Sequence, residues 1–254
     1  MGQGRALYDG ILAEAYDLWL AADDLRDVPV FRGLATDAPG PSLELGCGTG
    51  RVLVPMLAAG LDVEGLDASR DMLRACREKA AALGFDPVLH VADMADFDLG
   101  RRYGAIFSAV ASLSLLTAPG ALEGAIAAAR RHLVPGGRLA ASMDRPRPST
   151  EPGTRTVVRD VTRMSDGMRF RCVTETLPPE WPGTVRYRMT SEALGAGGRT
   201  ILRDEATVAF RCLEPDDFAQ LVSAAGFSVE AVRGADGGSL RPGDDGYLLF
   251  AVAR

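Results

Sequence analysis

The chain has 254 residues, of which 47% are hydrophobic and 24% charged, and its 34 acidic and 28 basic side chains give a net charge of −6. This length accommodates one large globular domain, with room for a subdomain. Proteins that bind nucleic acids usually carry a basic surface, so the acidic balance argues against a nucleic-acid partner. No apolar run approaches the roughly 20 residues needed to cross a bilayer, so we expect no membrane partner.

Cysteine and histidine usage argues against a metal site. The cysteines form no CxxC pair and the histidines are far apart, so no zinc-binding spacing exists. Unpaired cysteines are typical of a reducing compartment, and the N-terminus lacks the pattern of a signal peptide. We therefore expect a cytoplasmic protein. The residues concerned are Cys47, Cys76, Cys172, Cys212, His90 and His132.

The first forty residues are predicted to be helical, because apolar side chains recur at helical spacing from Leu7 to Trp19. Pro39-Gly40-Pro41 ends any helix before the first strand. Strand and helix signals then alternate, which predicts an α/β fold with a parallel sheet and helices on both faces. The predicted strands cover residues 42–47, 62–67, 87–92, 105–110 and 137–143, and the predicted helices cover 51–59, 69–83 and 118–132.

The pattern changes after Met143, where four strand-like runs follow one another. Ser165-Asp166-Gly167 and residues 195–198 have the composition of hairpin turns. We interpret residues 151–212 as an inserted antiparallel β subdomain, which could be a lid over a pocket or a dimer contact. Its predicted strands cover residues 155–164, 168–176, 185–191 and 201–212.

The α/β pattern resumes with a helix that opens at Glu214. Two last strands, predicted over residues 228–233 and 247–253, should form a hairpin at the sheet edge. Residues 1–150 and 213–254 therefore form the predicted core, a mostly parallel seven-stranded sheet with an N-terminal helical cap.

The run Leu43-Glu44-Leu45-Gly46-Cys47-Gly48-Thr49-Gly50 joins the first strand to the next helix. Glycine tolerates positive φ and lets a backbone approach a ligand closely. The N–H groups at the start of the helix could face a nucleotide-like cofactor. The spacing G-x-G-x-G differs from the G-x-G-x-x-G of dinucleotide folds, which counts against a nicotinamide-dependent dehydrogenase.

Two carboxylates stand at the ends of the second and third predicted strands. Asp67 can accept hydrogen bonds from both hydroxyls of a ribose, and Asp93 can accept a hydrogen bond from an exocyclic amine. The backbone N–H of Met94 can donate to an adenine nitrogen. Ligands of parallel α/β sheets bind at the carboxyl ends of the strands, where these residues are expected.

Taken together, these residues resemble the class I S-adenosylmethionine-dependent methyltransferases, and the overall plan is similar to those that act on amino sugars and antibiotic precursors. The resemblance covers residues 5–145 and 213–254 and implies a Rossmann-like core with S-adenosylmethionine as cofactor. The motifs that carry it are Tyr8-Asp9 with Ala15-Tyr16-Asp17, Glu44–Gly50, Asp67-Ala68-Ser69, Ala92-Asp93-Met94 and Leu133–Gly137.

The resemblance implies which residues hold the methionine portion of the cofactor. Gly46, Cys47 and Gly48 would face this portion, and we assign Cys47 no nucleophilic role. Glu44 would help to hold the ammonium group, either directly or through water. The backbone carbonyl of Ala109, which ends the fourth strand, would approach the same portion.

The resemblance also implies contacts to the nucleoside portion. Asp67, followed by Ala68, would bind the ribose hydroxyls. Met72 would cover one face of the adenine, although a methionine on an apolar helix face can equally be part of the core. Asp93 and Met94 would read the edge of the adenine.

Methyl transfer from a sulfonium is an in-line displacement that depends on alignment. A hydroxyl or carbon nucleophile often needs a positioned base, whereas an amine needs only its neutral form. Related enzymes often carry a histidine in the loop after the fourth strand, but residues 111–116 contain none. His90 and His132 are predicted to be structural. The missing base favours N-methylation of an amine.

Five polar residues are expected near the acceptor pocket. Tyr8 would border the cofactor. Tyr16 would border the methyl group, or would be a partly buried aromatic residue without such a role. Asp144 would hold a substrate amine or act as a weak base, or would be a loop carboxylate without a role. Ser112 and Ser114 lie in the loop after the fourth strand.

The sequence therefore predicts an S-adenosylmethionine-dependent methyltransferase that N-methylates a small molecule in specialised metabolism. O- or C-methylation and a cofactor-binding module without catalysis stay open. The many arginines of the insert are predicted to pair with acidic residues on a solvated strand face, the alternative being attraction of an anionic substrate. Its exposed strands could also pair in a homodimer.

Overall fold

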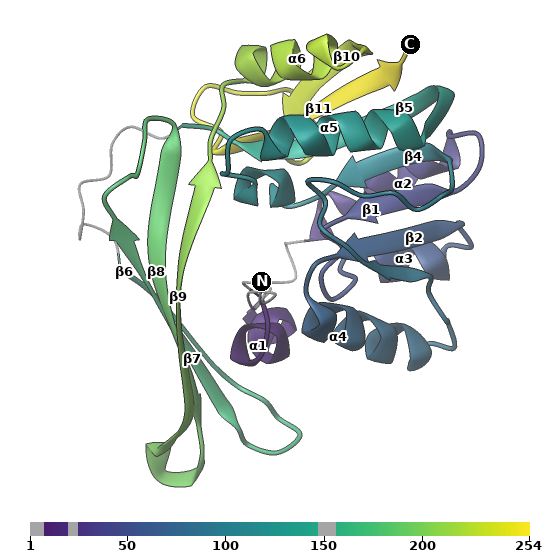
Figure 1. Cartoon of the computed structure of the whole chain (residues 1–254). Coiled ribbons are helices and arrows are strands. Elements are labelled where there is room, and N and C mark those ends of the chain that lie inside the picture. Colours follow the sequence, from purple (N-terminus) through teal and green to yellow (C-terminus); the bar gives the residue numbers. More distant parts are fainter. Residues whose placement is uncertain (1–7, 20–24, 147–155) are drawn as a thin grey trace.

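The computed structural model describes residues 8–19, 25–146 and 156–254, and within them the strands form two sheets (Figure 1). The larger sheet has seven strands in the order β10-β11-β5-β4-β1-β2-β3, and the smaller has four in the order β6-β7-β8-β9. The strands of the larger sheet are β1 (Ser42–Leu45), β2 (Val63–Asp67), β3 (Leu89–Val91), β4 (Tyr103–Ser108), β5 (Leu133–Asp144), β10 (Phe227–Gly234) and β11 (Gly246–Ala253). The helices around it are α2 (Val28–Thr36), α3 (Leu53–Ala58), α4 (Arg70–Ala81), α5 (Ala121–His132) and α6 (Pro215–Ala224), with a short 3-10 helix η2 (Ser112–Leu115).

Strand pairing confirms the predicted α/β fold. Strands β3, β2, β1, β4 and β5 run parallel to one another. Strand β11 pairs antiparallel with both β10 and β5. The predicted hairpin of the last two strands is therefore present at the sheet edge, with β10 outermost and β11 between β10 and β5.

Helices cover both faces of the larger sheet because its central strands are apolar on both sides. Leu43 and Ile106 pack with residues of α5 and α6 in one buried cluster. Ala105 and Phe107 pack with residues of α2, α3 and α4 in the other. Successive side chains of a strand face opposite sides, so continuous apolar runs are typical of strands buried on both faces.

Many element boundaries differ from the predicted ones by a few residues, and two of these differences have a clear local reason. The helix predicted from residue 69 begins one residue later, because Ser69 is its N-cap and accepts a hydrogen bond from the N–H of Met72 at 3.0 Å. The strand predicted from residue 137 begins at Leu133, because Leu133 already pairs with Tyr103 before the register shifts.

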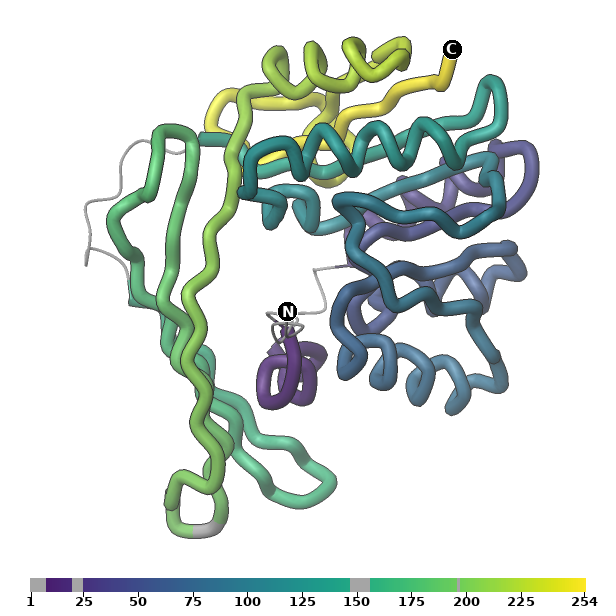
Figure 2. Tube along the Cα trace, viewed as in Figure 1, coloured from purple at the N-terminus to yellow at the C-terminus, as the bar shows by residue number. Residues whose placement is uncertain are grey.

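The four predicted strands of the insert form the smaller, antiparallel sheet. This sheet extends away from the core as a long curved ladder (Figure 2). Gly167 and Gly197, at φ angles of 72° and 74°, lie in the two predicted turns. The strands are β6 (Thr156–Thr162), β7 (Arg169–Leu177), β8 (Thr184–Leu194) and β9 (Thr200–Arg211), and a short 3-10 helix η3 (Ala196–Gly198) precedes β9.

Helix α1 (Ile11–Trp19) lies between the insert and the core (Figure 1). Ile11 and Ala15 pack against Phe170 and Ala193 of the insert. The same helix also contacts α4 of the core. It therefore bridges the two sheets at the side where the glycine turn lies.

The prediction of N-terminal helices is confirmed for α1 and α2. The helical prediction for residues 1–7 and 20–24 falls outside the described residues, as does the predicted boundary between core and insert at residues 150 and 151. Among the helices that the structure describes, none is long and apolar enough to span a membrane.

Candidate active site

The turn between β1 and α3 presents its middle glycine to open space. Gly46, Gly48 and Gly50 have φ angles of 68°, 53° and 80°, a region that other residues rarely adopt. A Cβ on Gly46 would lie 2.8 Å from the Cβ of Ser112, and one on Gly50 would lie 2.6 Å from the Sγ of Cys76. Around a Cβ on Gly48 nothing would lie within 4 Å. The backbone at Gly48 is thus a surface that a ligand can contact closely.

The carboxylate at the end of β2 binds this turn. Oδ2 of Asp67 accepts a hydrogen bond from the N–H of Gly48 at 2.9 Å, and Oδ1 accepts one from the N–H of Ser69 at 2.8 Å. Burial raises the pKa of Asp67, although these two donors act in the opposite direction. The structure thus brings Asp67 and the neighbouring Ala68 to the glycine turn.

The residues expected to contact an adenine lie close to the same edge. Asp93 is exposed after β3, and its Oδ1 accepts a hydrogen bond from the N–H of Ala95 at 2.8 Å. The sulfur of Met94 would lie 4.0 Å from a Cβ on Gly46. Met72 is buried in α4. Met94 therefore borders the glycine turn, while the burial of Met72 fits the core alternative as well as an adenine contact.

A carboxylate is buried beneath the turn. Glu44 is 2% exposed between Leu43 and Leu45, and its Oε2 has no hydrogen-bond partner. Burial raises the pKa of Glu44 well above its ordinary value, and the nearby Arg51 opposes this rise. Buried polar atoms without partners are uncommon in native proteins, so each calls for an explanation such as strain or a ligand.

The side chain of Cys47 points away from the open side of the turn. Its Sγ would lie 2.6 Å from a Cβ on Gly65, and the residue is 3% exposed within the buried cluster of α2, α3 and α4. Only the backbone of Cys47 can therefore face a ligand.

Both histidines are held by hydrogen bonds remote from the glycine turn. Nε2 of His90 lies 2.7 Å from Oε2 of Glu64. Nε2 of His132 accepts the N–H of Leu99 at 3.0 Å, so its Nδ1 carries the proton and donates to the carbonyl of Ala128 at 2.8 Å. These contacts fit the structural roles that the sequence predicts.

The segment before α1 lies against the connection between β2 and α4. The rings of Tyr8 and Tyr16 meet edge to face, with their centroids 5.8 Å apart. The hydroxyl of Ser69 donates to the carbonyl of Tyr8 at 3.1 Å. Burial, with Tyr16 and Asp67 nearby, raises the pKa of Tyr8, so its phenol stays neutral at physiological pH.

Helix α1 is also bound to the glycine turn by a polar network. Asp17 accepts a hydrogen bond from the hydroxyl of Thr49 at 2.6 Å and pairs with the Nζ of Lys79 at 2.6 Å. Thr49 belongs to the glycine turn and Lys79 to α4. The network therefore holds α1 in place over the glycine turn.

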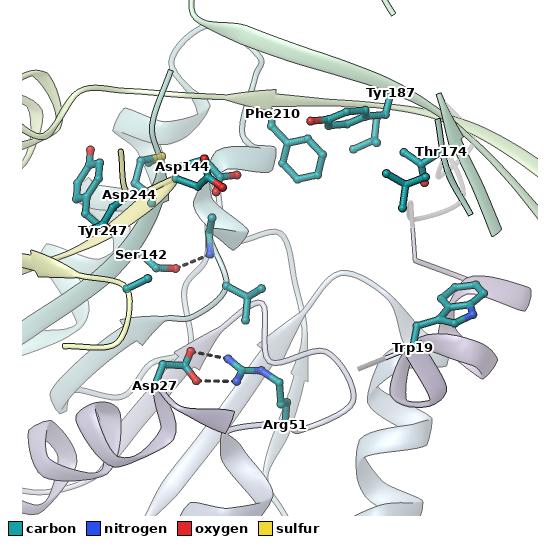
Figure 3. A pocket seen from close by; sticks show the side chains of 18 of the residues that line it. Trp19, Asp27, Arg51, Ser142, Asp144, Thr174, Tyr187, Phe210, Asp244 and Tyr247 are labelled. Atoms are coloured by element: carbon teal, nitrogen blue, oxygen red, sulfur yellow. Dashed lines mark hydrogen bonds and ion pairs between the residues drawn. The ribbon is translucent and has the colours of Figure 1, made fainter. Parts of the chain in front are cut away.

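A cavity of about 960 Å³ lies between the carboxyl ends of β4 and β5, helix α1 and the inner face of the insert (Figure 3). Of the predicted site residues, Tyr8, Tyr16 and Asp144 line it. Arg51 lines it as well, and its guanidinium binds the carboxylate of Asp27 through two hydrogen bonds of 2.6 and 2.7 Å. Arg51 follows Gly50 directly, so one lining residue of the cavity is next to the glycine turn in the chain.

The loop after β4 is joined to the end of β5. The hydroxyl of Ser114 accepts the N–H of Asp144 at 3.3 Å. The carbonyl of Ala109 accepts hydrogen bonds from both the N–H and the hydroxyl of Ser112, at 3.1 and 3.0 Å. The predicted contact of this carbonyl with a cofactor would therefore compete with bonds inside the loop.

The insert supplies cavity-lining side chains that sequence reasoning did not single out. Tyr187 and Phe210 face the cavity, with ring centroids 5.9 Å apart (Figure 3). Thr174 and Thr176 also line it, whereas Val173 and Glu175, which alternate with them along β7, line a groove on the other side of the sheet. The sequence shows the alternation of side chains along β7. It does not show which of the two faces of the strand lies toward the core.

The arginines of the insert divide between these two faces. Arg169 binds Asp160 at 2.5 Å and Arg188 lies 3.5 Å from Glu175, which fits the predicted pairing with acidic residues. Arg159 instead lines the cavity. An anionic part of a substrate would meet this arginine rather than the paired ones.

Comparison with known proteins agrees with this arrangement. Residues 43–137, which hold the glycine turn and both strand-end carboxylates, match a family model described as a methyltransferase domain. The sugar N-methyltransferase KedS8 from Streptoalloteichus has the same fold over the whole chain: it is 26% identical with a TM-score of 0.69, covering 100% of this chain and 99% of that one. These findings support the resemblance of the chain to the class I S-adenosylmethionine-dependent methyltransferases.

Two further relatives show how far this similarity extends. The dTDP-3-amino-3,4,6-trideoxy-alpha-D-glucopyranose N,N-dimethyltransferase of Streptomyces venezuelae is 33% identical over 140 residues, or 52% of this chain and 56% of that protein. The chain thus spans about half the length of the curated relatives it matches. An S-adenosylmethionine-dependent methyltransferase from Clostridium acetobutylicum has a TM-score of 0.77 at 14% identity, covering 96% of both chains, which shows the fold alone.

Proposed function

We propose that this methyltransferase transfers a methyl group from S-adenosylmethionine to an amine nitrogen of a small molecule in specialised metabolism. One observation carries the proposal: the same cavity is lined by Arg51, which directly follows the glycine turn in the chain, and by side chains of the insert. The names of the curated relatives and of KedS8 support an amino sugar as the class of substrate.

The residues around the glycine turn fit the methionine portion of this cofactor. The partnerless Oε2 of Glu44 suits the ammonium group, directly or through water. The open backbone at Gly48, with Gly46 and the backbone of Cys47 beside it, leaves room for the chain of the ligand. The carbonyl of Ala109 would complete this part of the site.

The nucleoside portion would lie along the ends of β2 and β3. Each oxygen of a carboxylate can accept more than one hydrogen bond, so Asp67 can bind ribose hydroxyls while it holds the glycine turn. Asp93 and Met94 would bind the edge of the adenine, and Met72 would lie below its face. Tyr8 would close the site from α1.

When bound, S-adenosylmethionine supplies an electrophilic methyl carbon. The contribution of the chain is to hold the acceptor nitrogen in line with this carbon, which needs geometry more than a strong base. Tyr16 and Asp144 line the cavity and would bind the amine through the phenol and the carboxylate. The nitrogen attacks as a neutral amine, and the proton that it then loses would pass to Asp144 or to water.

The hydrogen bonding of the histidines favours an amine over a hydroxyl or carbon nucleophile. His90 and His132 are both engaged away from the cavity, and neither lines it. A hydroxyl acceptor would need another base, and Asp144 is the side chain best placed for that alternative. A cofactor-binding module without catalysis would retain the same cofactor residues.

We further propose that the insert is a lid, because one of its faces lines the cavity. Pairing of its strands in a homodimer is the alternative. The net charge of −6 disfavours a nucleic-acid partner, and the four free cysteines favour the cytoplasm.

The test is turnover by the purified chain with methyl-labelled S-adenosylmethionine. The acceptors would be dTDP-linked and free amino sugars, simple phenols and activated carbon acids. We expect S-adenosylhomocysteine to form with amines and the label to appear on nitrogen. Transfer only to phenols or carbons would contradict N-methylation, and cofactor binding without any turnover would indicate the non-catalytic module.

A further inference from the structure

The turn after β4 has an unusual backbone. Val110 and Ala111 have φ angles of 50° and 52°, and among the described residues they are the non-glycine residues with positive φ. The left-handed region is disfavoured for any residue with a Cβ, and most of all for a β-branched one such as valine. Two such residues in succession persist only where the surrounding structure holds them.

Hydrogen bonds on both sides hold this turn. The N–H of Ala111 donates to the hydroxyl of Ser142 on β5, shown as a dashed line in Figure 3. The carbonyl of Ala111 accepts the N–H of Ser114 at 2.8 Å, and the N–H of Ser112 donates to Ala109 at 3.1 Å. The strained conformation is therefore fixed by the end of the neighbouring strand and by η2.

The strained backbone exposes one apolar side chain inside the cavity. Val110 is 56% exposed and Ala111 is 9% exposed, and both line the cavity together with Tyr16 and Asp144. An exposed valine with a strained backbone does not stabilise the fold, because its side chain does not fill the core and its backbone conformation is unfavourable. What the strain does is to project an isopropyl group towards the space where the acceptor would lie.

We propose that Val110 is a specificity-determining residue: its isopropyl group contacts the carbon skeleton of the acceptor next to the reacting nitrogen and limits the bulk allowed there. This proposal rests on the proposed function. It assigns Val110 no part in cofactor binding and no part in proton transfer. Its removal should therefore change which amines react, without changing how the cofactor binds.

The first test compares Val110→Gly with Val88→Gly. Val88 is 52% exposed, lies outside the cavity and does not have a positive φ. Glycine adopts positive φ without strain, so Val110→Gly should melt no lower than the wild type. Val88→Gly should melt slightly lower, because glycine increases the entropy of the unfolded chain.

The second test measures kcat/KM for methylamine, isopropylamine, tert-butylamine and a dTDP-linked amino sugar, by formation of S-adenosylhomocysteine. Val110→Gly should raise the ratio of kcat/KM for bulky over slender amines by about fivefold, as expected for methyl-sized changes in an apolar contact. Val110→Ile, which keeps the strained turn and adds a methyl group, should lower that ratio. The dissociation constant for S-adenosylmethionine, measured by calorimetry, should stay unchanged in both variants.

An unchanged ratio in both variants would overturn the role of Val110, as would an equal loss of cofactor affinity and of activity for every amine. If the wild type methylates no amine at all, the proposed function fails instead. The two failures are distinguishable because the first requires measurable turnover by the wild type.

Discussion

The two walls of the candidate site are built by different means. On the core side, the glycine turn and the ends of β2 and β3 present backbone groups and carboxylates in fixed positions, such as Gly48 and Asp67. On the insert side, strands β7, β8 and β9 present side chains at alternate positions, such as Thr174, Tyr187 and Phe210. The first wall requires particular residue types at fixed positions of the sequence. The second wall requires only that side chains facing the cavity stand at alternate positions along each strand. A sequence of this kind therefore predicts the cofactor better than the acceptor.

The largest expected effect is on the core wall, at Asp67. Replacing it by alanine removes the partner of the Gly48 N–H and of the ribose hydroxyls. Hydrogen bonds to a charged group are worth about 1.5–3 kcal/mol each, so the affinity for S-adenosylmethionine should fall by about 100-fold. Calorimetry measures this change.

The matched control for Asp67 is Asp62→Ala. Asp62 precedes the same strand at its opposite end and pairs with Arg101 through side chains that are 66% and 45% exposed. Exposed ion pairs contribute little, so this variant should bind the cofactor like the wild type. Equal affinity losses in both variants would show that β2 as a whole, rather than its last carboxylate, carries the effect.

A second experiment separates backbone strain from ligand contact. Gly48 and Gly60 have φ angles of 53° and 80°, and around either one an added Cβ would find nothing within 4 Å. Alanine at either position should cost about 1–2 kcal/mol of folding free energy from left-handed strain. Only Gly48→Ala should also weaken S-adenosylmethionine binding, by about tenfold, because the new methyl group occupies the surface assigned to the ligand. Equal affinities in the two variants, measured by calorimetry, would remove Gly48 from the cofactor site.

On the insert wall the expected effect falls on the acceptor. Phe210→Ala should raise the KM of the acceptor by about tenfold, because an aromatic contact with a ligand is lost. The affinity for S-adenosylmethionine should not change. Val173→Ala, on the other face of the same sheet, should alter neither quantity. Steady-state kinetics measures both variants. A weaker binding of S-adenosylmethionine by Phe210→Ala, with the KM of the acceptor unchanged, would contradict the division between the two walls.

The smallest expected effect concerns the buried carboxyl of Glu44 and depends on pH. Its folded-state pKa is raised by burial above the ordinary value of 4.5, so the protonated form favours folding. The stability that this proton provides is complete below pH 4.5 and is lost as pH rises through the raised pKa. Glu44→Gln avoids that loss, so without cofactor it should melt higher than the wild type at pH 8 and no higher at pH 4.

The same variant should bind S-adenosylmethionine several-fold more weakly at pH 8, because a neutral amide replaces the acceptor proposed for the ammonium group. Thermal melts at the two pH values, with and without cofactor, measure both effects. An advantage in melting temperature that is equal at both pH values would show that the Glu44 carboxyl does not titrate as described.

Much of the core could be predicted from the sequence because its constraints are local. Alternating apolar runs specify the parallel strands, and the glycine turn followed by Asp67 specifies where a ligand lies. The position of β11 between β10 and β5 could not be predicted, since either of the last two strands could occupy the edge on local pattern alone.

For the insert wall, the sequence predicted the antiparallel strands but not the side chains that line the cavity. Period-two alternation in β7 leaves two faces equivalent until the sheet is placed against the core. The pair Asp27–Arg51 and the brace from Ser142 to Ala111 are contacts between residues distant in the chain, which no local pattern reports. The conformation of Val110 could not be predicted from the sequence either, because a positive φ is disfavoured for valine.

The most direct test of this account is a crystal structure of the chain with S-adenosylhomocysteine. We predict density for the ribose at Asp67, for the amino-acid portion along Gly46–Gly48 above Glu44, and for the sulfur facing the cavity between Tyr16 and the insert. Density for the ligand at any other place, or no binding at millimolar concentration, would contradict it.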